Sequence, residues 1–579
     1  MAEVKNKILV VGGGLAGLMT TIKLAEAGHN VDIFSIVPCK RSHSVCAQGG
    51  INASVNTKGE GDSPQIHFEE TILGGDFLAN QPMVLEMCKN APNFVYMLDR
   101  MGVQFNRTPE GLIDFRRFGG TRFHRTAFAG STTGQQLLYA LDEQVRRFES
   151  EGKVTRYEGW EFLSAVLDDE GRGRGIVALN LTNFEIRSFK GDAIVMATGG
   201  CGMIYGRSTM SMICTGAAAG AVFQQGVHYA NGEFIQVHPT SIAGEDKNRL
   251  ISEAVRGEGG RVWTYKDGKR WYFLEEWYPK YGNLVPRDIA TRAIFKAVRE
   301  MKLGVDGKDV VYLDISHIDK KVLQSKLAGI LEIYEKFMNE DPTKVPMRIF
   351  PSVHYSMGGI YIDSTHMTNV QGILAAGEAD YQYHGANRLG ANSLLSCLQG
   401  GFSSAKTAGE YVQGLKQSSE EISSKFFDQQ LKKEEEKQDQ ILRMRGNENP
   451  YKIWEEMGVT MTDNLTVVRY NKNIAETDQK LLELKERAKN INVNDISKWA
   501  NQSVVFTRQL LNMLEIARCI TLGALARNES RGAHYKPDFP NRDDQNWLKT
   551  TVAKYTPNGP ELSYEAVDTS LLKPRERKY

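Results

Sequence analysis

The stretch Lys7-Ile-Leu-Val-Val-Gly-Gly-Gly-Leu-Ala-Gly17 decides the fold of this chain. An apolar run leads directly into glycines spaced as G-x-G-x-x-G between Gly12 and Gly17. Residues 18–27 then follow a helical pattern, and residues 30–34 have the pattern of a second strand. A strand, a glycine turn, a helix and a strand in this order form the βαβ unit in which the spacing indicates dinucleotide binding. The glycines let the backbone approach a pyrophosphate at the amino end of the helix.

The residue that follows the second strand favours FAD over NAD. Units that bind NAD place Asp or Glu there to bond a ribose hydroxyl, whereas this chain has Ser35. Two further buried strands end in glycine turns, one over residues 192–200 and one over residues 370–378. Because the three strand–glycine turns are far apart in the chain, they imply one discontinuous nucleotide-binding domain with another domain inserted.

The composition changes after the last of these turns. From about residue 411 the chain becomes charged and helix-favouring, as in residues 432–437, and Leu510, Leu514 and Ala517 recur at helical spacing. We therefore expect an α/β fold: a Rossmann-like FAD-binding domain with an inserted α+β capping domain, then a helical domain and a C-terminal tail. The predicted limits are 1–237 and 354–410 for the FAD-binding domain, 238–353 for the capping domain, 411–523 for the helical domain and 524–579 for the tail.

Charge and cysteine content exclude several classes of protein. The 71 basic and 70 acidic residues nearly cancel, to a net charge of +1, which argues against a dedicated nucleic-acid binder. We find no apolar run near the roughly 20 residues of a membrane span and no signal peptide, so we expect a soluble chain made in the cytoplasm. The seven cysteines are scattered and form no C-x-x-C pair. We therefore expect no disulfide framework, no flavin disulfide reductase and no metal cluster held by this chain.

A histidine motif follows the second strand, where an isoalloxazine ring would pass. Arg41-Ser42-His43-Ser44 precedes Ala47-Gln48-Gly49-Gly50. With these motifs the chain resembles, from residue 7 to the carboxy terminus, the flavoprotein subunits of succinate dehydrogenase and fumarate reductase, and residues 35–50 are most similar to the form in Gram-positive and related bacteria. The resemblance implies a covalent bond between His43 and FAD. L-aspartate oxidases share the Ala-Gln-Gly-Gly segment but lack this histidine, and such a soluble FAD enzyme stays the alternative.

Five polar motifs flank the predicted flavin domain and suit a small dicarboxylate. Two anionic ends call for two polar clamps, and arginine recognises a carboxylate bidentately. The motifs are Gln236-Val-His-Pro-Thr240, Ile251-Ser-Glu-Ala-Val-Arg-Gly-Glu-Gly-Gly260, Pro286-Arg-Asp288, His354-Tyr-Ser-Met-Gly-Gly359 and Gly385-Ala-Asn-Arg-Leu-Gly-Ala-Asn-Ser-Leu394.

The resemblance assigns roles within these motifs. The implied catalytic residues are His238 and Ser252 on one substrate carboxylate, His354 and Arg388 on the other, Arg287 as the group that exchanges a proton with the substrate carbon, and Glu253 and Arg256 as the proton relay to solvent. Arginine has a pKa above ~12 and is a poor base. In the oxidation direction Arg287 therefore needs a neighbouring carboxylate such as Glu253.

The implied FAD contacts extend beyond the glycine turn. They are Gly12, Gly13, Gly14, Leu15, Ala16, Gly17, Ser35, Arg41, Ser42, His43, Ser44, Gln48, Gly49, Gly50, Ala197, Thr198, Gly199, Glu378, Arg388, Ser393 and Leu394. One departure from the family concerns the other end of the cofactor. Ala217 stands where many relatives carry an aspartate near the FAD adenosine. The sequence does not tell which residue, if any, makes that contact here.

The resemblance implies an enzyme that oxidises succinate to fumarate, or catalyses the reverse, by hydride transfer with covalently bound FAD. Both directions use the same residues, so the sequence does not set the direction. Because this chain has no cluster for one-electron transfer, the resemblance also implies an iron–sulfur subunit, a membrane cytochrome b subunit and a quinone reached through them. The tail motif over residues 527–534 would face the iron–sulfur partner. The chain would lie peripherally on the cytoplasmic side of the cell membrane, with no nucleic-acid partner.

Overall fold

The computed structural model describes residues 7–577, and its central element is a five-stranded parallel sheet in the order β19-β10-β1-β2-β6. The strands are β1 (Lys7–Val11), β2 (Asn30–Ser35), β6 (Val154–Glu158), β10 (Ala193–Met196) and β19 (Ile373–Ala375). Most of their residues are buried, as expected for a parallel sheet covered on its faces. The predicted Rossmann-like α/β domain is confirmed.

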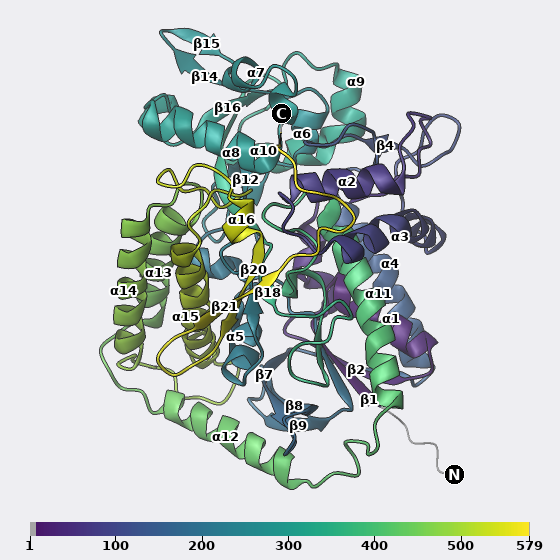
Figure 1. Ribbon diagram of the computed structural model, residues 1–579, viewed down its shortest axis with the longest axis vertical. Coiled ribbons are helices and arrows are strands. Elements are labelled where there is room, and N and C mark those ends of the chain that lie inside the picture. The colour runs from purple at the N-terminus through teal and green to yellow at the C-terminus, as the bar shows by residue number, and fades with distance from the viewer. Residues whose placement is uncertain (1–6, 578–579) are drawn as a thin grey trace.

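Three helices and a small antiparallel sheet pack on this central sheet (Figure 1). The helices are α1 (Leu15–Glu26), α4 (Thr133–Ser150) and α11 (Asn392–Gln413). The small sheet consists of β7 (Trp160–Leu167), β8 (Gly173–Asn180) and β9 (Ile186–Lys190). The remaining elements of this part are β3 (Ile51–Asn52), β4 (Phe115–Arg116), β5 (Thr126–Ala127), α2 (Pro64–Gly74), α3 (Gln81–Arg100) and α5 (Ala217–Gln224).

Helix α1 begins three residues earlier than the sequence predicts. It starts at Leu15, directly after Gly14, and not at Leu18. The reason is the close packing of the glycine turn, because a Cβ at Gly17 would collide with the carbonyl oxygen of Gly12. Only glycine permits that contact, so the last part of the motif is already helical.

The inserted region forms a six-stranded sheet in the order β13-β12-β17-β16-β14-β15, at the top of Figure 1. Its strands are β12 (Ile235–Ile242), β13 (Arg249–Leu250), β14 (Arg261–Lys266), β15 (Lys269–Trp271), β16 (Val311–Asp314) and β17 (Met347–Ser356). Its helices are α6 (Ala254–Gly257), α7 (Phe273–Trp277), α8 (Arg287–Phe295), α9 (Lys320–Val322) and α10 (Ala328–Met338). The region has an apolar core of its own. The domain limits stay a prediction, and those at 237/238 and 353/354 fall within β12 and β17.

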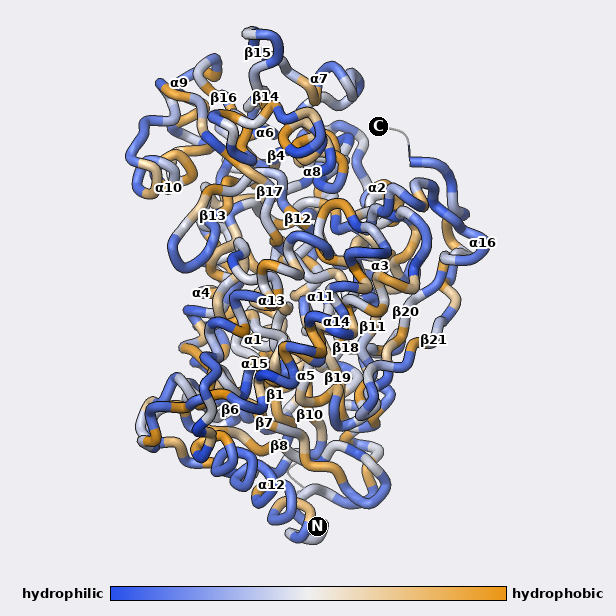
Figure 2. The backbone as a smooth tube through the Cα atoms, turned by 90° about the vertical axis from the view of Figure 1, so that its left-hand side faces the viewer, coloured by the Kyte–Doolittle hydropathy of each residue, from blue (hydrophilic) through white to orange (hydrophobic). Residues whose placement is uncertain are grey.

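Four long helices follow in the chain. They are α12 (Lys425–Leu442), α13 (Pro450–Leu465), α14 (Asn471–Ala488) and α15 (Gln502–Ala526). The charged run over residues 432–437 lies mostly exposed on α12, which Figure 2 shows as largely hydrophilic. By length and composition α15 could cross a membrane, at variance with our expectation, but 72% of its most apolar window is buried inside the protein. A helix buried in a protein core can have the same length and apolar composition as a helix that crosses a membrane.

The tail adds strands to the body of the protein. Strands β20 (Lys549–Lys554) and β21 (Glu561–Ala566) extend a sheet with β11 (Tyr229–Ala230) and β18 (Gly359–Ile360), next to α16 (Asp544–Trp547). That the tail motif faces the iron–sulfur partner stays a prediction, while several of its side chains pair within this chain. Arg527, Glu529, Arg531 and His534 are buried, and Arg527 pairs with Glu233 at 2.7 Å. These side chains hold the tail to this chain.

Candidate functional site

A cavity of about 720 Å³ lies where the carboxyl ends of the parallel strands meet the inserted sheet. Val11, Ser35 and Ala197 line it from the ends of β1, β2 and β10, while His238 and Arg287 line it from β12 and α8. Open α/β sheets bind ligands at this edge, and the volume is in the usual range of about 300–1,000 Å³ for ligand pockets.

The structure brings most of the predicted residues to this one cavity. Those that line it are Gly12, Gly13, Gly14, Leu15, Ala16, Ser35, Ser42, His43, Ser44, Gln48, Gly49, Gly50, Ala197, Thr198, Gly199, His238, Ser252, Glu253, Arg287, His354, Glu378, Arg388, Ser393 and Leu394. Three others do not line it. Gly17 packs inside the turn, the Arg41 side chain is exposed, and Arg256 is buried behind Glu253.

The glycine turn forms a wall made of backbone. Gly12 has a φ of +120°, and a Cβ there would collide with the Ala197 carbonyl oxygen. A Cβ at Gly13 would meet the side chains of Cys39 and Ser35. The turn leads into the amino end of α1, whose free N–H groups attract anions. This wall fits a pyrophosphate and leaves no room for larger residues.

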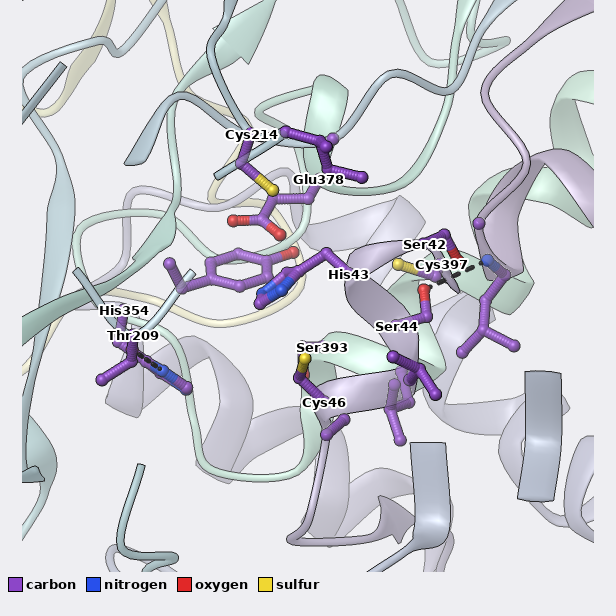
Figure 3. Close-up of a pocket in the computed structure, with 18 of the residues that line it drawn as sticks. Ser42, His43, Ser44, Cys46, Thr209, Cys214, His354, Glu378, Ser393 and Cys397 are labelled. Carbon is purple, nitrogen blue, oxygen red and sulfur yellow. Dashed lines mark hydrogen bonds between the residues drawn. The ribbon is translucent and has the colours of Figure 1, made fainter. Parts of the chain in front are cut away.

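His43 lies in the middle of the cavity, beside Glu378 (Figure 3). Its Nδ1 accepts a hydrogen bond from the Ser211 N–H at 3.1 Å. Burial, followed by the charge of Lys247, lowers the pKa of His43 to about 3, so the ring is neutral at physiological pH. Glu378 accepts a hydrogen bond from the Ser356 N–H at 3.0 Å, and burial raises its pKa to about 7.

Two histidines from the paired strands β12 and β17 face each other. The rings of His238 and His354 are 4.9 Å apart, edge to face. Nδ1 of His238 accepts a bond from the Thr240 N–H at 3.2 Å, and its Nε2 is buried without a hydrogen-bond partner within residues 7–577. His354 Nδ1 bonds to the Thr209 hydroxyl at 2.8 Å (Figure 3). Burial, helped by nearby arginines, lowers the pKa of both rings well below the usual value. His238 Nε2 is therefore a hydrogen-bond donor that a ligand can use.

Two buried arginines complete this end of the cavity. Arg388 packs over the Tyr355 ring, 4.3 Å from its centre, and its Nε has no hydrogen-bond partner in the described part of the chain. Burial, followed by the charge of Arg287, lowers the pKa of Arg388 to about 9, so it stays charged at neutral pH. Arg287 donates from Nε to Glu253 at 2.7 Å and from Nη1 to Gln236 at 3.0 Å. The Arg287 guanidinium is therefore fixed by two hydrogen bonds, whereas that of Arg388 has a donor left for a ligand.

Glu253 connects Arg287 to the interior. It also accepts the Gly119 N–H at 2.8 Å and lies 3.5 Å from Arg256. Burial alone would raise the pKa of Glu253, but the charges of Arg287 and Arg256 lower it overall. The adjacent Ser252 hydroxyl accepts the Ala254 N–H at 3.2 Å, which leaves its own hydrogen for a ligand.

Several contributors were not predicted from sequence. Gln236 and Tyr355 lie within motifs that we quoted, next to predicted residues, but had no assigned role. Arg116 lies outside every motif, yet it donates from Nε to the Gly49 carbonyl at 2.9 Å and so supports the loop after β2. Glu161 and Gln509 line the cavity from β7 and α15. Within residues 7–577, no three His, Cys, Asp or Glu side chains gather as a metal site requires.

Comparisons with known proteins agree with this geometry. The family described as FAD binding domain matches residues 7–394, and the family described as fumarate reductase flavoprotein C-term matches residues 454–579. The chain is 65% identical to the succinate dehydrogenase flavoprotein subunit of Bacillus subtilis, across 99% of this chain and 98% of that protein. It is 34% identical to the fumarate reductase flavoprotein subunit of Escherichia coli, across 100% of this chain and 96% of that one.

A solved structure of Escherichia coli quinol fumarate reductase superposes with a TM-score of 0.93 at 33% identity and covers 99% of this chain and 98% of its own. Mycobacterium smegmatis Sdh1 in complex with UQ1 gives 0.84 at 29% identity, with 97% and 94% covered. These relatives do not support the alternative of an L-aspartate oxidase. The chain belongs to the family of flavoprotein subunits of succinate dehydrogenase and fumarate reductase.

Proposed function

We propose that this protein interconverts succinate and fumarate at bound FAD. The observation that carries the proposal is the pairing, in one cavity, of a glycine wall with two buried donors, His238 Nε2 and Arg388 Nε, which have no hydrogen-bond partner among the described residues. Leaving a buried charged donor unsatisfied is costly, and a dicarboxylate satisfies such donors. When bound, FAD supplies the hydride acceptor or donor.

The substrate carboxylates bind to two neighbouring clamps. His238 and Ser252 donate hydrogen bonds to one carboxylate, and His354 and Arg388 bind the other. The two histidine rings are in contact, which brings the clamps together at the scale of a four-carbon chain. Because this end of the cavity is buried, each charged hydrogen bond is stronger than it would be in water.

Arg287 carries the proton that complements the hydride. Glu253 and Gln236 fix two of its nitrogens, and the guanidinium therefore keeps one orientation toward the substrate carbon. In fumarate reduction Arg287 donates the proton. In succinate oxidation it must lose a proton first, and Glu253, at 2.7 Å, and Arg256 behind it form the relay. A positioned acid of this kind contributes about 10²–10⁴-fold to the rate.

His43 would hold the FAD covalently. The Ser211 N–H occupies the lone pair of Nδ1, so Nε2 carries the proton of the neutral ring. Nε2 would be the bonding nitrogen, and it would release this proton as the bond to the flavin forms. Exchanging a carbon–hydrogen bond of the flavin for a carbon–nitrogen bond is a two-electron oxidation that releases protons. Fumarate, or the quinone-linked partners, accepts the two electrons.

Denaturation in acid tests the covalent bond. The wild-type polypeptide should keep yellow flavin fluorescence on a denaturing gel, whereas His43→Ser should release all its flavin while still binding it in the folded state. In the variant, succinate oxidation should fall more than fumarate reduction, since the resemblance makes the bond a means of raising the flavin potential. Release of flavin from the wild-type chain would refute the attachment.

Electrons leave through partner subunits. The seven cysteines are free and scattered, so one-electron transfer to a quinone requires an iron–sulfur subunit and a membrane cytochrome b subunit. These partners hold the chain peripherally on the cytoplasmic side of the cell membrane.

The purified chain tests the function as a whole. With succinate and an artificial dye it should turn over, and malonate should inhibit it competitively. With a quinone in place of the dye it should be inactive until the partner subunits are added. Dye reduction that does not depend on succinate, or quinone reduction by the chain alone, would contradict the proposal.

A further inference from the structure

The cavity has a third part, remote from the substrate residues. If FAD occupies the cavity as proposed, its flavin lies by His43 and its pyrophosphate by the glycine turn of β1. The adenosine then lies beyond that turn, toward β2, as in other dinucleotide-binding units. Ser35, Glu161 and Gln509 line the cavity in this direction.

The usual adenosine ligands are missing from this chain. The residue at the end of β2 that normally bonds the ribose as Asp or Glu is Ser35, and the aspartate of many relatives is replaced by Ala217. Both positions line the cavity, so the structure leaves the ribose hydroxyls without the carboxylate that such units ordinarily provide.

The neighbouring strand brings a carboxylate to the same edge of the sheet. Strand β6 pairs in parallel with β2, with Ser35 opposite Glu158. The chain then turns at Gly159, whose φ is +74°, and enters β7. Glu161 is therefore three residues beyond the partner of Ser35, at the carboxyl edge where the ribose-binding residue of β2 would lie.

The Glu161 side chain is prepared for a ligand. It is 7% exposed. Its Oε1 accepts a hydrogen bond from Gln509 Nε2 at 2.7 Å, while its Oε2 is buried and has no hydrogen-bond partner among the described residues. Burial raises the pKa of Glu161, and the charge of Arg508 opposes this effect. A buried carboxylate oxygen without a donor is costly, and a ribose hydroxyl is a donor.

We propose that Glu161 binds the adenosine ribose of FAD in place of the acidic residue that β2 lacks, and that Gln509 positions it. Gln509 belongs to α15 of the helical region, which packs on α5 beside β7 (Figure 1). The helical region thereby completes the cofactor site. The inference rests on the proposal that FAD occupies the cavity.

The test compares FAD with FMN, which lacks the adenosine monophosphate part of FAD. In full-length His43→Ser, where flavin is not tethered, the dissociation constants of FAD and FMN are measured by fluorescence quenching. Adding Glu161→Leu should weaken FAD binding about tenfold to a hundredfold, the range for a hydrogen bond to a charged group, and leave FMN binding unchanged. The isosteric Glu161→Gln should lose less, because its amide oxygen still accepts. The exposed Glu185→Gln serves as the matched control and should change neither constant.

Cofactor analogues identify the contact. FAD with a 2′-deoxyadenosine moiety should bind equally to His43→Ser with and without Glu161→Leu, because it lacks the hydroxyl that donates a hydrogen bond to Glu161. FAD with hypoxanthine in place of adenine should keep the difference between them; loss of the difference with hypoxanthine would overturn the ribose assignment in favour of the base. An equal loss of FAD and FMN affinity in both Glu161 variants would show a structural role only and overturn the inference. Wild-type protein that carries no FAD would remove the proposed function, and the inference with it.

Discussion

The two walls of the cavity are built in opposite ways. On the side of the parallel sheet the wall is backbone: Gly12 and Gly13 exclude any side chain, and the amino end of α1 offers N–H groups. The opposite wall consists of buried charged side chains, among them Arg287 and Glu253 of the inserted region and Arg388 of the loop before α11. A backbone wall selects a ligand by shape, whereas desolvated side chains select it by charge. Substitutions on the two sides should therefore separate flavin retention from substrate chemistry.

The largest separation is expected at Arg287. Arg287→Lys should keep the fold and the flavin and lose about 10²–10⁴-fold in turnover in both directions. Lysine keeps the charge but cannot hold bonds to Glu253 and Gln236 while pointing a third donor at the substrate. Steady-state rates with a dye, normalised to flavin content, measure the loss. A variant that retains more than about a tenth of the wild-type rate would remove Arg287 from proton transfer.

Arg388→Ala should weaken dicarboxylate binding by about 2–5 kcal/mol, the cost of losing one partner of a buried charge pair. The flavin should stay in place, since the backbone wall is untouched. The dissociation constant of malonate, followed by the change in flavin absorbance, gives the result. Acetate, which has one carboxylate, serves as the control ligand and should be affected much less. An unchanged malonate constant would show that the charged wall does not bind the second carboxylate.

On the opposite wall, Gly12→Ala should have the reverse effect. The φ of +120° disfavours any residue with a Cβ by about 1–3 kcal/mol, and the new methyl group would collide with the Ala197 carbonyl. We expect a lower flavin content and a lower melting temperature. In the molecules that still carry flavin, the malonate constant should be normal. A variant with full flavin occupancy and weak malonate binding would contradict the division between the two walls.

The sequence predicted the backbone wall more completely than the charged one. Glycine spacing encodes its own conformation, so the turn at Gly12 could be located without tertiary information. Arg256 was predicted in the site through its motif, but α6 turns it behind Glu253. The polar residue that faces the adenosine end, Glu161, lies in no motif, because its position depends on the pairing of β2 with β6. The ion pairs of the tail motif were not predicted for a similar reason: composition cannot tell a buried ion pair from an exposed one.

The smallest expected effect is on the pH dependence of stability, and it comes from a neutral histidine on the flavin side. His67 of α2 is fully buried, and its Nε2 must donate to Asn392 Oδ1, 3.0 Å away, because a carbonyl oxygen only accepts. Burial, followed by the charge of Arg125, lowers the pKa of His67 to about 3, whereas the unfolded value is about 6.5. Between these values the unfolded chain binds a proton that the folded chain does not. Stability should therefore fall as the pH drops below about 6.5, by up to about 1.4 kcal/mol per pH unit from this residue.

His67→Gln isolates this contribution, because its amide N–H can make the bond to Asn392 and does not titrate. Chemical denaturation at pH 7, 6 and 5 should give similar pH dependence for the two chains above about pH 6.5 and a shallower decline for His67→Gln below it. The flavin content should be the same in both chains, since His67 does not line the cavity. Parallel stability curves down to pH 5 would mean that His67 is protonated in the folded protein. His67 would then be a second buried cation beside Arg125, and the neutral role assigned to it would be wrong.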